Sequence, residues 1–395
     1  MKSKIAGLLF LLGICLFHPC SASSKEKNRK LIVGSGDASC PGATFSHIQD
    51  AIAQAADGAE IRVCAGIYDE AISIRTSIHL MGDTGATIMP SHLLPNATSL
   101  TSGSQFSAIL QVMDADEVTI EGVVFDAGAA SITQCSPDLI GILFQNSSGT
   151  IKQNTVRNTK LGASLNGCQS GLGIFVQSGN GGTSEVVIAE NHVTDYQKNG
   201  ITADELGTIV TIRDNDVIGQ GATTGAAQNG IQIGYGATGE ISHNFVTGHI
   251  WSPCRSAGQC LYFATGILVE QSDHVSVEGN SVGNNQVNIL INGRDAHVAR
   301  NRVYGAVVLD GIQILGDDSS AEDNRIVNST EAAISVYANN ITVRDNIIIN
   351  APIGILQASS AIGLRRSNNR FVDVAKTFVD PEISELVAGR HDPVR

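Results

Sequence analysis

The chain has 395 residues, of which 42% are apolar and 5% aromatic, and its formal net charge at pH 7 is −13. This length allows a large buried core in one or two domains. The excess of negative charge repels nucleic acid, anionic lipid and strongly acidic polyuronates, whereas a neutral glycan is tolerated. After the first residues no stretch is apolar enough to span a membrane, so we expect neither nucleic-acid binding nor membrane insertion.

The N-terminus is typical of an export signal. Lys2 and Lys4 precede an apolar run over residues 5–17, and the small residues from Cys20 to Ala22 offer a cleavage site. The run is too short to span a bilayer with ease. We therefore predict a signal peptide over residues 1–22 and a secreted mature chain, extracellular or periplasmic, over residues 23–395.

Six cysteines remain after the predicted signal, in three couples that are local in the sequence: Cys40 and Cys64, Cys135 and Cys168, and Cys254 and Cys260. An oxidising compartment permits three disulfides, although six cysteines allow 15 connectivities. The alternative is six free buried thiols. Ligation of a metal by cysteine is disfavoured because the chain has no Cys-x-x-Cys spacing.

Residues 44–58 predict an amphipathic helix. Ser46 and Gln49 have the spacing of a capping box, and Gly58 supplies a stop. Five apolar residues share one face of this helix: Phe45, Ile48, Ala51, Ile52 and Ala55. We expect the helix to cover the open first coil of the domain that follows it.

The rest of the chain is an internal repeat. The phrase Asn-Gly-Ile-Gln-Ile at 229–233 recurs as Asp-Gly-Ile-Gln-Ile at 310–314, and related phrases follow each other at intervals of 21 to 36 residues. In each unit an Ile follows the aligned small residue: Ile142, Ile174, Ile201, Ile231, Ile267, Ile289, Ile312, Ile334 and Ile355. Each unit then carries an Asn: Asn154, Asn191, Asn215, Asn244, Asn280, Asn301, Asn324, Asn346 and Asn369.

The repeat predicts an all-β parallel solenoid. Each unit holds short strands of alternating polarity and no segment long enough for a crossover helix. Coils of this kind bury their apolar side only by stacking, so the Ile residues would form one internal ladder. Asn at a sharp bend tolerates a positive φ, and its amide can bond to the Asn of the next coil. We expect a single domain with its cap at about 44–58, coils over 59–374 and a C-terminal cap or tail over 375–395.

The opening "FSHIQDAIAQAADGAEIRVCAGIYDEAISI", followed by stacked "NGI…N.V" coils, resembles the right-handed parallel β-helix proteins of the pectin-lyase-like superfamily over roughly residues 31–374. This resemblance implies the fold. The superfamily includes polysaccharide lyases, glycoside hydrolases, uronan epimerases and non-catalytic surface proteins, so the fold does not choose an activity. The Asn-Thr-Asp and Asp-Pro-His signatures of its enzymes are missing, and no catalytic residue carries over from the resemblance.

Three insertions lengthen the earlier coils, at 157–171, 219–229 and 247–265. Insertions at one point of a stacked coil emerge on one side, which is often a binding face. The third contains Trp251 and Tyr262, whose rings suit stacking on sugars. The alternative is that Trp251 anchors this loop to the coil.

The outward column at the end of the first strand contains Asp204, Gly234 and Glu270 in successive coils. Coils about 4.8 Å apart put the two carboxylates roughly 9 to 10 Å apart, near the upper limit for the acid and base of an inverting glycosidase. The alternative is that both are solvated surface charges. Five further residues are candidates for binding substrate: Glu205, Tyr235, Gln271, Asn292 and Arg294.

Asp273, Asp295 and Asp318 are expected to share a column in the turns after this strand. Stacked carboxylates repel each other unless a cation or an Arg lies between them, so a calcium site is one interpretation. Turn-forming Asp residues that bond their own backbone are the commoner explanation. We expect no other cofactor.

Our leading hypothesis is a secreted carbohydrate-active protein that cleaves glycosidic bonds of a neutral or weakly charged polysaccharide, as a hydrolase first and a lyase second. Its glycan would lie along residues 200–292, under the loop at 247–265. The alternative is a non-catalytic β-helix that binds a polysaccharide or cell-surface glycan in adhesion. Clustered loops and paired carboxylates favour the enzyme, and the low aromatic content favours the binding protein.

Overall fold

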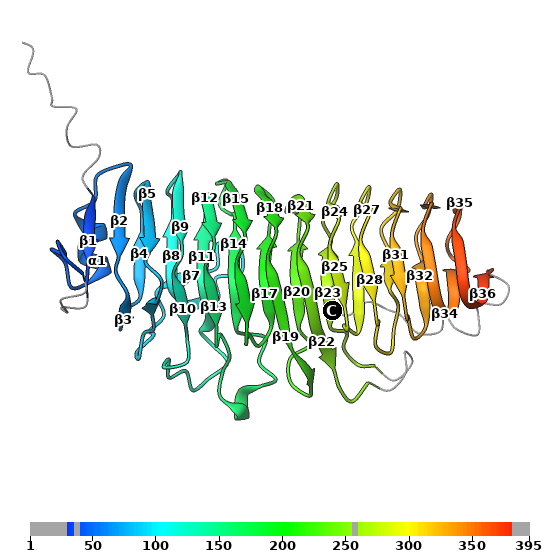
Figure 1. Cartoon of the computed structure of the whole chain (residues 1–395), viewed down its shortest axis with the longest axis horizontal. Coiled ribbons are helices and arrows are strands. Elements are labelled where there is room, and N and C mark those ends of the chain that lie inside the picture. Colours follow the sequence, from blue (N-terminus) through cyan, green and yellow to red (C-terminus); the bar gives the residue numbers. More distant parts are fainter. Residues whose placement is uncertain (1–29, 35–39, 255–259, 381–395) are drawn as a thin grey trace, which may run out of the picture.

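The computed structural model describes residues 30–34, 40–254 and 260–380. These residues form an elongated solenoid whose coils stack along one axis from the N-terminal to the C-terminal end (Figure 1). The predicted signal peptide and residues 381–395 of the predicted tail lie outside the described residues. The all-β solenoid predicted from the repeat is confirmed.

Within the described residues, one wall is a parallel sheet of 13 strands, which we call sheet A. Its strands in spatial order are β1 (Leu31–Val33), β2 (Ala59–Val63), β5 (Ile78–Gly82), β9 (Val118–Glu121), β12 (Ser148–Lys152), β15 (Ser184–Ala189), β18 (Thr208–Arg213), β21 (Thr238–Ser242), β24 (Ser276–Glu278), β27 (His297–Ala299), β30 (Ser320–Glu322), β33 (Thr342–Arg344) and β35 (Arg365–Ser367).

Of the other 23 strands in the described residues, 22 form two ladders, which join because the long strands β34 and β36 run through both. The first, which we call the site ladder, contains β4 (Ile72–Ile74), β8 (Gln105–Met113), β11 (Asp138–Gln145), β14 (Leu172–Gln177), β17 (Asn199–Asp204), β20 (Asn229–Gly234), β23 (Thr265–Glu270), β26 (Val287–Asn292), β29 (Ile312–Ile314), β32 (Ala332–Val336), β34 (Ile347–Gln357) and β36 (Arg370–Val379). The second contains β3 (Gly66–Tyr68), β6 (Ala86–Ile88), β10 (Val124–Asp126), β13 (Thr155–Arg157), β16 (His192–Thr194), β19 (Asp216–Thr223), β22 (Phe245–Trp251), β25 (Ser281–Gly283), β28 (Arg302–Tyr304) and β31 (Arg325–Val327). A short strand, β7 (Ala97–Thr98), pairs antiparallel with β8.

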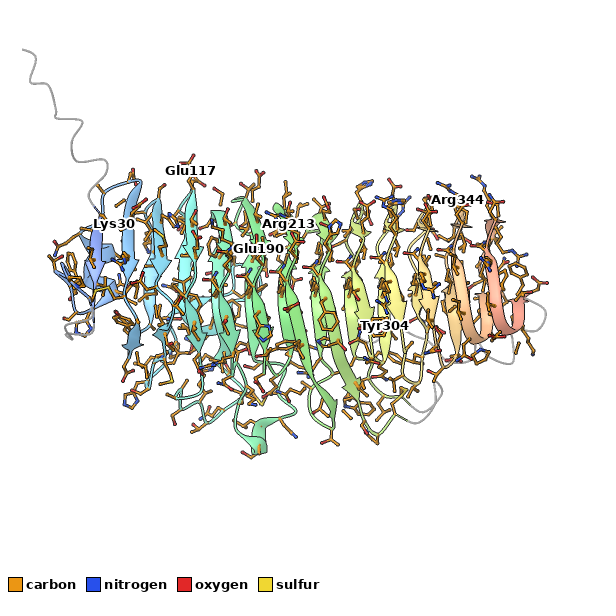
Figure 2. The ribbon with its side chains drawn as sticks, in the orientation of Figure 1. Lys30, Glu117, Glu190, Arg213, Tyr304 and Arg344 are labelled. Atoms are coloured by element: carbon orange, nitrogen blue, oxygen red, sulfur yellow. A yellow bond between two sulfur atoms is a disulfide. The ribbon has the colours of Figure 1, made fainter. Side chains whose placement is uncertain are left out.

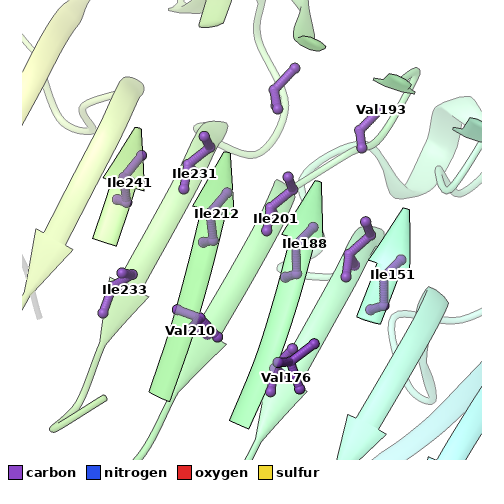
Figure 3. Close-up of a cluster of buried hydrophobic side chains, with 14 of the residues drawn as sticks. Ile151, Val176, Ile188, Val193, Ile201, Val210, Ile212, Ile231, Ile233 and Ile241 are labelled. Carbon is purple, nitrogen blue, oxygen red and sulfur yellow. The ribbon is translucent and has the colours of Figure 1, made fainter. Parts of the chain in front are cut away.

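The predicted Ile ladder is confirmed. All nine Ile residues are fully buried, and neighbours in the ladder pair in register. Figure 3 shows Ile201 and Ile231 in the core with Ile188 and Ile212 of sheet A. Burial of such a side chain contributes about 1.5–3 kcal/mol. Charged side chains such as Glu117 and Arg344 project from the outside of the solenoid (Figure 2).

The Asn residues form a continuous hydrogen-bonded column from Asn154 to Asn369. Each Asn backbone N–H and side-chain Nδ2 donates to Oδ1 of the next Asn, at 2.9 to 3.1 Å. The positive φ was assigned to the wrong residue, because the left-handed conformation belongs to the residue before each Asn, for example Asp214 and His243. This bend aims the Asn side chain along the stack.

The predicted N-terminal helix is shorter than its pattern. Helix α1 spans Ile48–Ala53 and lies at the N-terminal end of the solenoid (Figure 1), where β1 is the outermost strand of sheet A. The expected capping box does not form. Instead the Glu70 carboxylate accepts hydrogen bonds from the backbone N–H groups of Ile48 and Gln49, at 2.7 and 3.0 Å. The Gln49 side chain is bonded to the backbone of Ser73, so it does not make the capping-box hydrogen bond to the backbone of Ser46.

The sequence-local cysteine couples are confirmed as disulfides: Cys40–Cys64, Cys135–Cys168 and Cys254–Cys260. At the other end, β36 continues to Val379, five residues beyond the expected end of the coils at 374. In the part of the chain that the structure describes, every helix is too short or too polar to cross a membrane.

Candidate functional site

The outer face of the site ladder carries a band of polar side chains across β17, β20, β23 and β26. In β17, Ile201 and Ala203 are buried in the core, so strand alternation turns Thr202 and Asp204 to the outside. Asn199 joins them, because its Nδ2 donates a hydrogen bond to Oγ1 of Thr202 at 3.1 Å. The same positions of the next three strands add five polar residues. We call the whole set the polar strip: Asn199, Thr202, Asp204, Asn229, Gln232, Thr265, Glu270 and Asn292.

Gln232 connects the strip by hydrogen bonds. Its Nε2 donates to both carboxylate oxygens of Asp204, at 3.1 and 3.3 Å, and its Oε1 accepts from Nδ2 of Asn199 and of Asn229, at 3.0 and 3.2 Å. Thr265 donates from Oγ1 to Oδ1 of Asn229 at 2.8 Å. The network fixes the orientation of the Asp204 carboxylate.

Asp204, Gly234 and Glu270 occupy one column, as the sequence predicts, since Asp204 pairs with Gly234 and Gly234 with Glu270. Two coil spacings of about 4.8 Å separate the carboxyl-bearing positions by roughly 9 to 10 Å. Gly234 keeps this gap open, because a Cβ there would lie 2.6 Å from Oδ1 of Asp204. Burial raises the pKa of Asp204 to about 7, and the nearby Glu205 charge adds to the rise, while the Gln232 hydrogen bond opposes it.

Glu270 has different neighbours. Its carboxylate accepts hydrogen bonds from Nδ2 of Asn292, at 3.1 and 3.2 Å, and from Nε2 of Gln271 at 3.2 Å. Tyr235 is half-exposed, and the pKa of its hydroxyl is raised by burial and by the charges of Asp204, Glu270 and Glu205. Its side chain is therefore within electrostatic range of both members of the pair.

A segment that the repeat alignment missed borders the strip. Residues 97–104, which we call the strap, lie before the first aligned coil yet cross to the ends of β11, β14 and β17. Gln145 donates to the carbonyl of Thr98 at 2.9 Å, and Gln177 bonds to both Ser99 and Leu100 at 3.1 Å. The Thr101 hydroxyl donates to Oε1 of Glu205 at 2.7 Å. A dense run of Ser and Thr at 99–104 was the one available signal.

The three insertions meet on one side, as predicted, but not over the carboxylates. Asn166 of the first accepts a hydrogen bond from Ala226 of the second at 2.7 Å, and the Trp251 indole of the third donates to Gly225 at 3.1 Å. These loops precede β14, β20 and β23, whereas Asp204 and Glu270 stand at the opposite ends of their strands. A six-residue strand separates its two ends by about 17 Å. The expectation that the glycan lies under the loop at 247–265 therefore does not extend to the carboxylate pair.

Trp251 serves as an anchor. It is 6% exposed and packs on Ala227 and Ala264, so its ring is covered by protein. Tyr262 stands edge-on to it, with ring centroids 5.2 Å apart, and is 51% exposed. Of the two aromatic candidates, only Tyr262 presents its ring to solvent. Residues 255–259 of this loop lie outside the described residues.

The three acidic turn residues do not share one column as predicted, because Asp273 is offset by one residue from Asp295 and Asp318. Asp273 accepts from the backbone of Arg294, whereas Asp295 contacts His274 at 2.9 Å. Asp318 accepts from Asn340 at 3.0 Å and lies 3.5 Å from the Arg294 guanidinium. Protein donors thus occupy all three carboxylates, and within residues 30–34, 40–254 and 260–380 no group of three or more His, Cys, Asp or Glu could hold a metal ion. The residues do not fit a calcium site.

The second copy of the repeated phrase places another carboxyl on the same face. Asp310 occupies the position of Asn229 and is only 2% exposed. Its Oδ1 accepts from the backbone N–H of Ala332 at 3.0 Å. Burial, together with the charge of Glu331, raises the pKa of Asp310 to about 7. Sequence reasoning missed this group, although the substitution of Asp for Asn in a recurring phrase was visible.

The parallel ladders define a solenoid of the right-handed parallel β-helix class, and the family model for the right handed beta helix region matches residues 180–371. The chain is a right-handed parallel β-helix protein. A comparison with curated proteins finds no match.

Two solved structures share the fold at low sequence identity. A GH136 lacto-N-biosidase from Eubacterium ramulus superposes with a TM-score of 0.56 at 11% identity, covering 89% of this chain and 68% of that one. PfbA, a surface adhesin of Streptococcus pneumoniae, gives 0.50 at 14% identity, covering 83% and 86%.

Proposed function

We propose that this chain is an exported glycoside hydrolase that cleaves a neutral or weakly charged polysaccharide with inversion, using Asp204 as general acid and Glu270 as general base. The observation that carries the proposal is the Asp204–Gly234–Glu270 column. It combines a carboxyl whose pKa is raised to about 7 with a second carboxylate two coils away and an open glycine between them. Pairs of carboxyl groups in contrasting environments are the usual arrangement for this reaction.

In the proposed reaction the protonated Asp204 gives its proton to the glycosidic oxygen as the C–O bond breaks. A water held by Glu270 attacks the anomeric carbon from the opposite face and passes a proton to that carboxylate. Asp204 ends ionised and Glu270 ends protonated, and exchange with solvent restores both. Tyr235 is suited to binding the attacking water or a sugar hydroxyl, because it lies within electrostatic range of both groups.

The substrate class follows from charge and hydrogen bonding. Accessible uncharged polar groups beside the carboxylate pair include the Tyr235 hydroxyl and the Asn292 amide, which match the hydroxyls of a neutral sugar. With a net charge of −13 the protein disfavours polyuronates. Export is supported by the three disulfides, which persist in oxidising compartments. A lacto-N-biosidase on the same fold is compatible with glycan hydrolysis, as likeness of fold alone.

The test is a glycan panel on the mature chain from Ser23. Xylo-, cello-, manno- and galacto-oligosaccharides of two to six units would be incubated with the wild type, Asp204→Asn and Glu270→Gln. New reducing ends, absent with both variants, are the expected result, and proton NMR of the fresh product should report inverted anomeric configuration. Unsaturated products would contradict hydrolysis and favour a lyase.

The second candidate is a binding protein without catalysis. The observation that favours it is that the polar groups of the strip already have hydrogen-bond partners within the protein. Asn199, Asn229 and Gln232 bond one another and are at most 7% exposed, and Gln232 also bonds Asp204, so this network has a structural role. The PfbA adhesin has the same fold. Glycan binding on the same panel, with no new reducing ends, would support this candidate over the hydrolase.

A further inference from the structure

A hollow of about 420 Å³ opens beside the carboxylate pair, at the C-terminal ends of β14 and β17. Its walls are Thr101 of the strap, the turn at 178–182 after β14, and the turn at 205–207 after β17. Glu205 follows Asp204 directly, and Asp204 pairs with Gln177 of the preceding coil. The hollow therefore lies on the N-terminal side of the Asp204–Glu270 pair.

The strap forms a fixed wall. The Thr101 hydroxyl holds Oε1 of Glu205 at 2.7 Å, and the backbone N–H of Leu100 holds Oε1 of Gln177 at 3.1 Å. Leu100 also packs against Gly179, where an added Cβ would come within 2.5 Å of the leucine Cβ. Glycine at this position is what lets the strap approach the coil. These contacts within the chain fix the position of the strap at the edge of the hollow.

Glycine residues also line the floor of the hollow. Gly181 has φ +81° with nothing within 4 Å of its missing Cβ, and Gly207 has φ +93°. Gly182 approaches Asn146 so closely that a Cβ would meet its carboxamide. Gly181 therefore leaves open space where a side chain would otherwise stand, and Gly182 and Gly207 let their turns pack closely against their neighbours.

The chemistry of the hollow is amphipathic. Glu205 supplies carboxylate oxygens that accept from hydroxyls, as they already do from Thr101. Leu206 is 82% exposed, which leaves its apolar surface uncovered beside the carboxylate. A pyranose ring carries both partners, with hydroxyl donors at its edge and C–H groups on its face. A few oriented polar groups beside apolar surface are typical of small-ligand sites.

We propose that this hollow is a subsite for one further sugar unit of the glycan, on the Asp204 side of the bond that is cleaved; this rests on the proposed function. Glu205 accepts hydrogen bonds from the ring hydroxyls, and Leu206 packs on the ring face. Thr101 is a positioning residue that orients the Glu205 carboxylate. The strap thereby sets a preference for longer chains.

The test measures binding rather than turnover, so that it does not depend on hydrolysis. Calorimetric titrations of the oligosaccharide panel would use the full mature chain in the Glu270→Gln background. The comparison is between the shortest oligosaccharide that binds and its homologue one unit longer. We expect Glu205→Gln to weaken binding of the longer one about tenfold and to leave the shorter one unchanged, because only the longer one reaches the hollow.

Thr101→Val should weaken the longer ligand about threefold, and Thr101→Ser, which retains the hydroxyl, should restore it. The matched control is Ser102→Ala on the same strap, whose hydroxyl bonds Ser104 and does not line the hollow. If Thr101→Val fails to fold, the isosteric Glu205→Gln still carries the test. Any of three results would overturn the inference: the variants weaken short and long ligands equally, they weaken neither, or the parent protein gains no affinity with ligand length. Length-dependent loss without hydrolysis by the wild type would retain the subsite and refute the hydrolase.

Discussion

Gly234→Ala is the sharpest test of the carboxylate pair, because the change adds one methyl group between its members. The φ angle of Gly234 is not in the left-handed region, so alanine fits the backbone there. The added Cβ would lie 2.6 Å from Oδ1 of Asp204 and 3.2 Å from Nε2 of Gln232. The carboxylate is the movable partner and must shift.

The size of that shift sets the expected effect. Ordinary contact begins at 3.4 Å, so the Asp204 oxygen must retreat by about 0.8 Å. A misplacement on the order of 1 Å in a catalytic group costs about 10²-fold in rate, or roughly 2.7 kcal/mol of transition-state stabilisation. Folding stability should change little, since a compatible Gly→Ala substitution stabilises by about 0.4–1 kcal/mol through the unfolded chain.

The assay is kcat/KM on the best oligosaccharide from the panel, with thermal unfolding on the same samples. Gly162→Ala is the matched control, because Gly162 has φ −58° and nothing lies within 4 Å of its missing Cβ. We expect about a 10²-fold loss for Gly234→Ala and none for Gly162→Ala, with similar Tm values. Wild-type kcat/KM in Gly234→Ala would refute the reasoning, and a collapse of Tm would assign the loss to the fold instead.

Three further outcomes follow from the structure. The pKa of Asp204 is about 7 in the folded state against an ordinary 3.8, so between these pH values the folded state keeps a proton that the unfolded state releases. The protonated Asp204 therefore contributes stability that is fully present below about pH 4 and is lost as the pH rises through 7. Asp204→Asn should therefore exceed the wild type in free energy of unfolding at pH 8 by at least about 1.4 kcal/mol and match it at pH 4, by urea denaturation; a constant difference would contradict this. Burial lowers the pKa of His249 to about 4, so the neutral imidazole contributes stability that is present above about pH 6.5 and is lost as the pH falls through 4. His249→Gln should therefore make the free energy of unfolding fall less steeply between about pH 6.5 and 4 in the same assay. An unchanged slope would place the titrating group elsewhere. Asn244→Ala unpairs buried groups in two neighbouring coils and should cost about 2–4 kcal/mol, whereas Asn369→Ala at the end of the column unpairs groups in one neighbouring coil and should cost about 1–2 kcal/mol. Equal costs would argue against the column as a source of stability.

The fold was accessible from the sequence because its core obeys a strict local rule. An inward position in a stacked coil must be apolar, so Ile201 and Ile231 repeat where the stack requires them. The aligned columns followed from the same rule, which is why Asp204 and Glu270 were placed correctly relative to Gly234. Local cysteine couples were likewise predictable, because stacked coils bring near neighbours in sequence together.

The rest depended on contacts that no repeat encodes. Thr101 meets Glu205 across 104 residues, and the strap lies outside the aligned units. Trp251 was ambiguous because a ring in a long loop suits both a ligand and the loop itself, and only its burial decides. The one-residue error at Asp273 arose because the turns there place Asp295 and Asp318, not Asp273, in the left-handed position.

The Asn column has a mechanical consequence. Its hydrogen bonds, like those of the sheets, run along the long axis of the solenoid, so a pulling force on the two ends loads every inter-coil interface in series. Such a rod yields first at its weakest interface and not all at once. The interfaces from Asn154 to Asn369 are reinforced by the column, and the Cys40–Cys64 bond covalently ties the first coil. Rupture under tension should therefore begin between these two regions, near β5 and β9, and leave the segment that carries Asp204 and Glu270 intact.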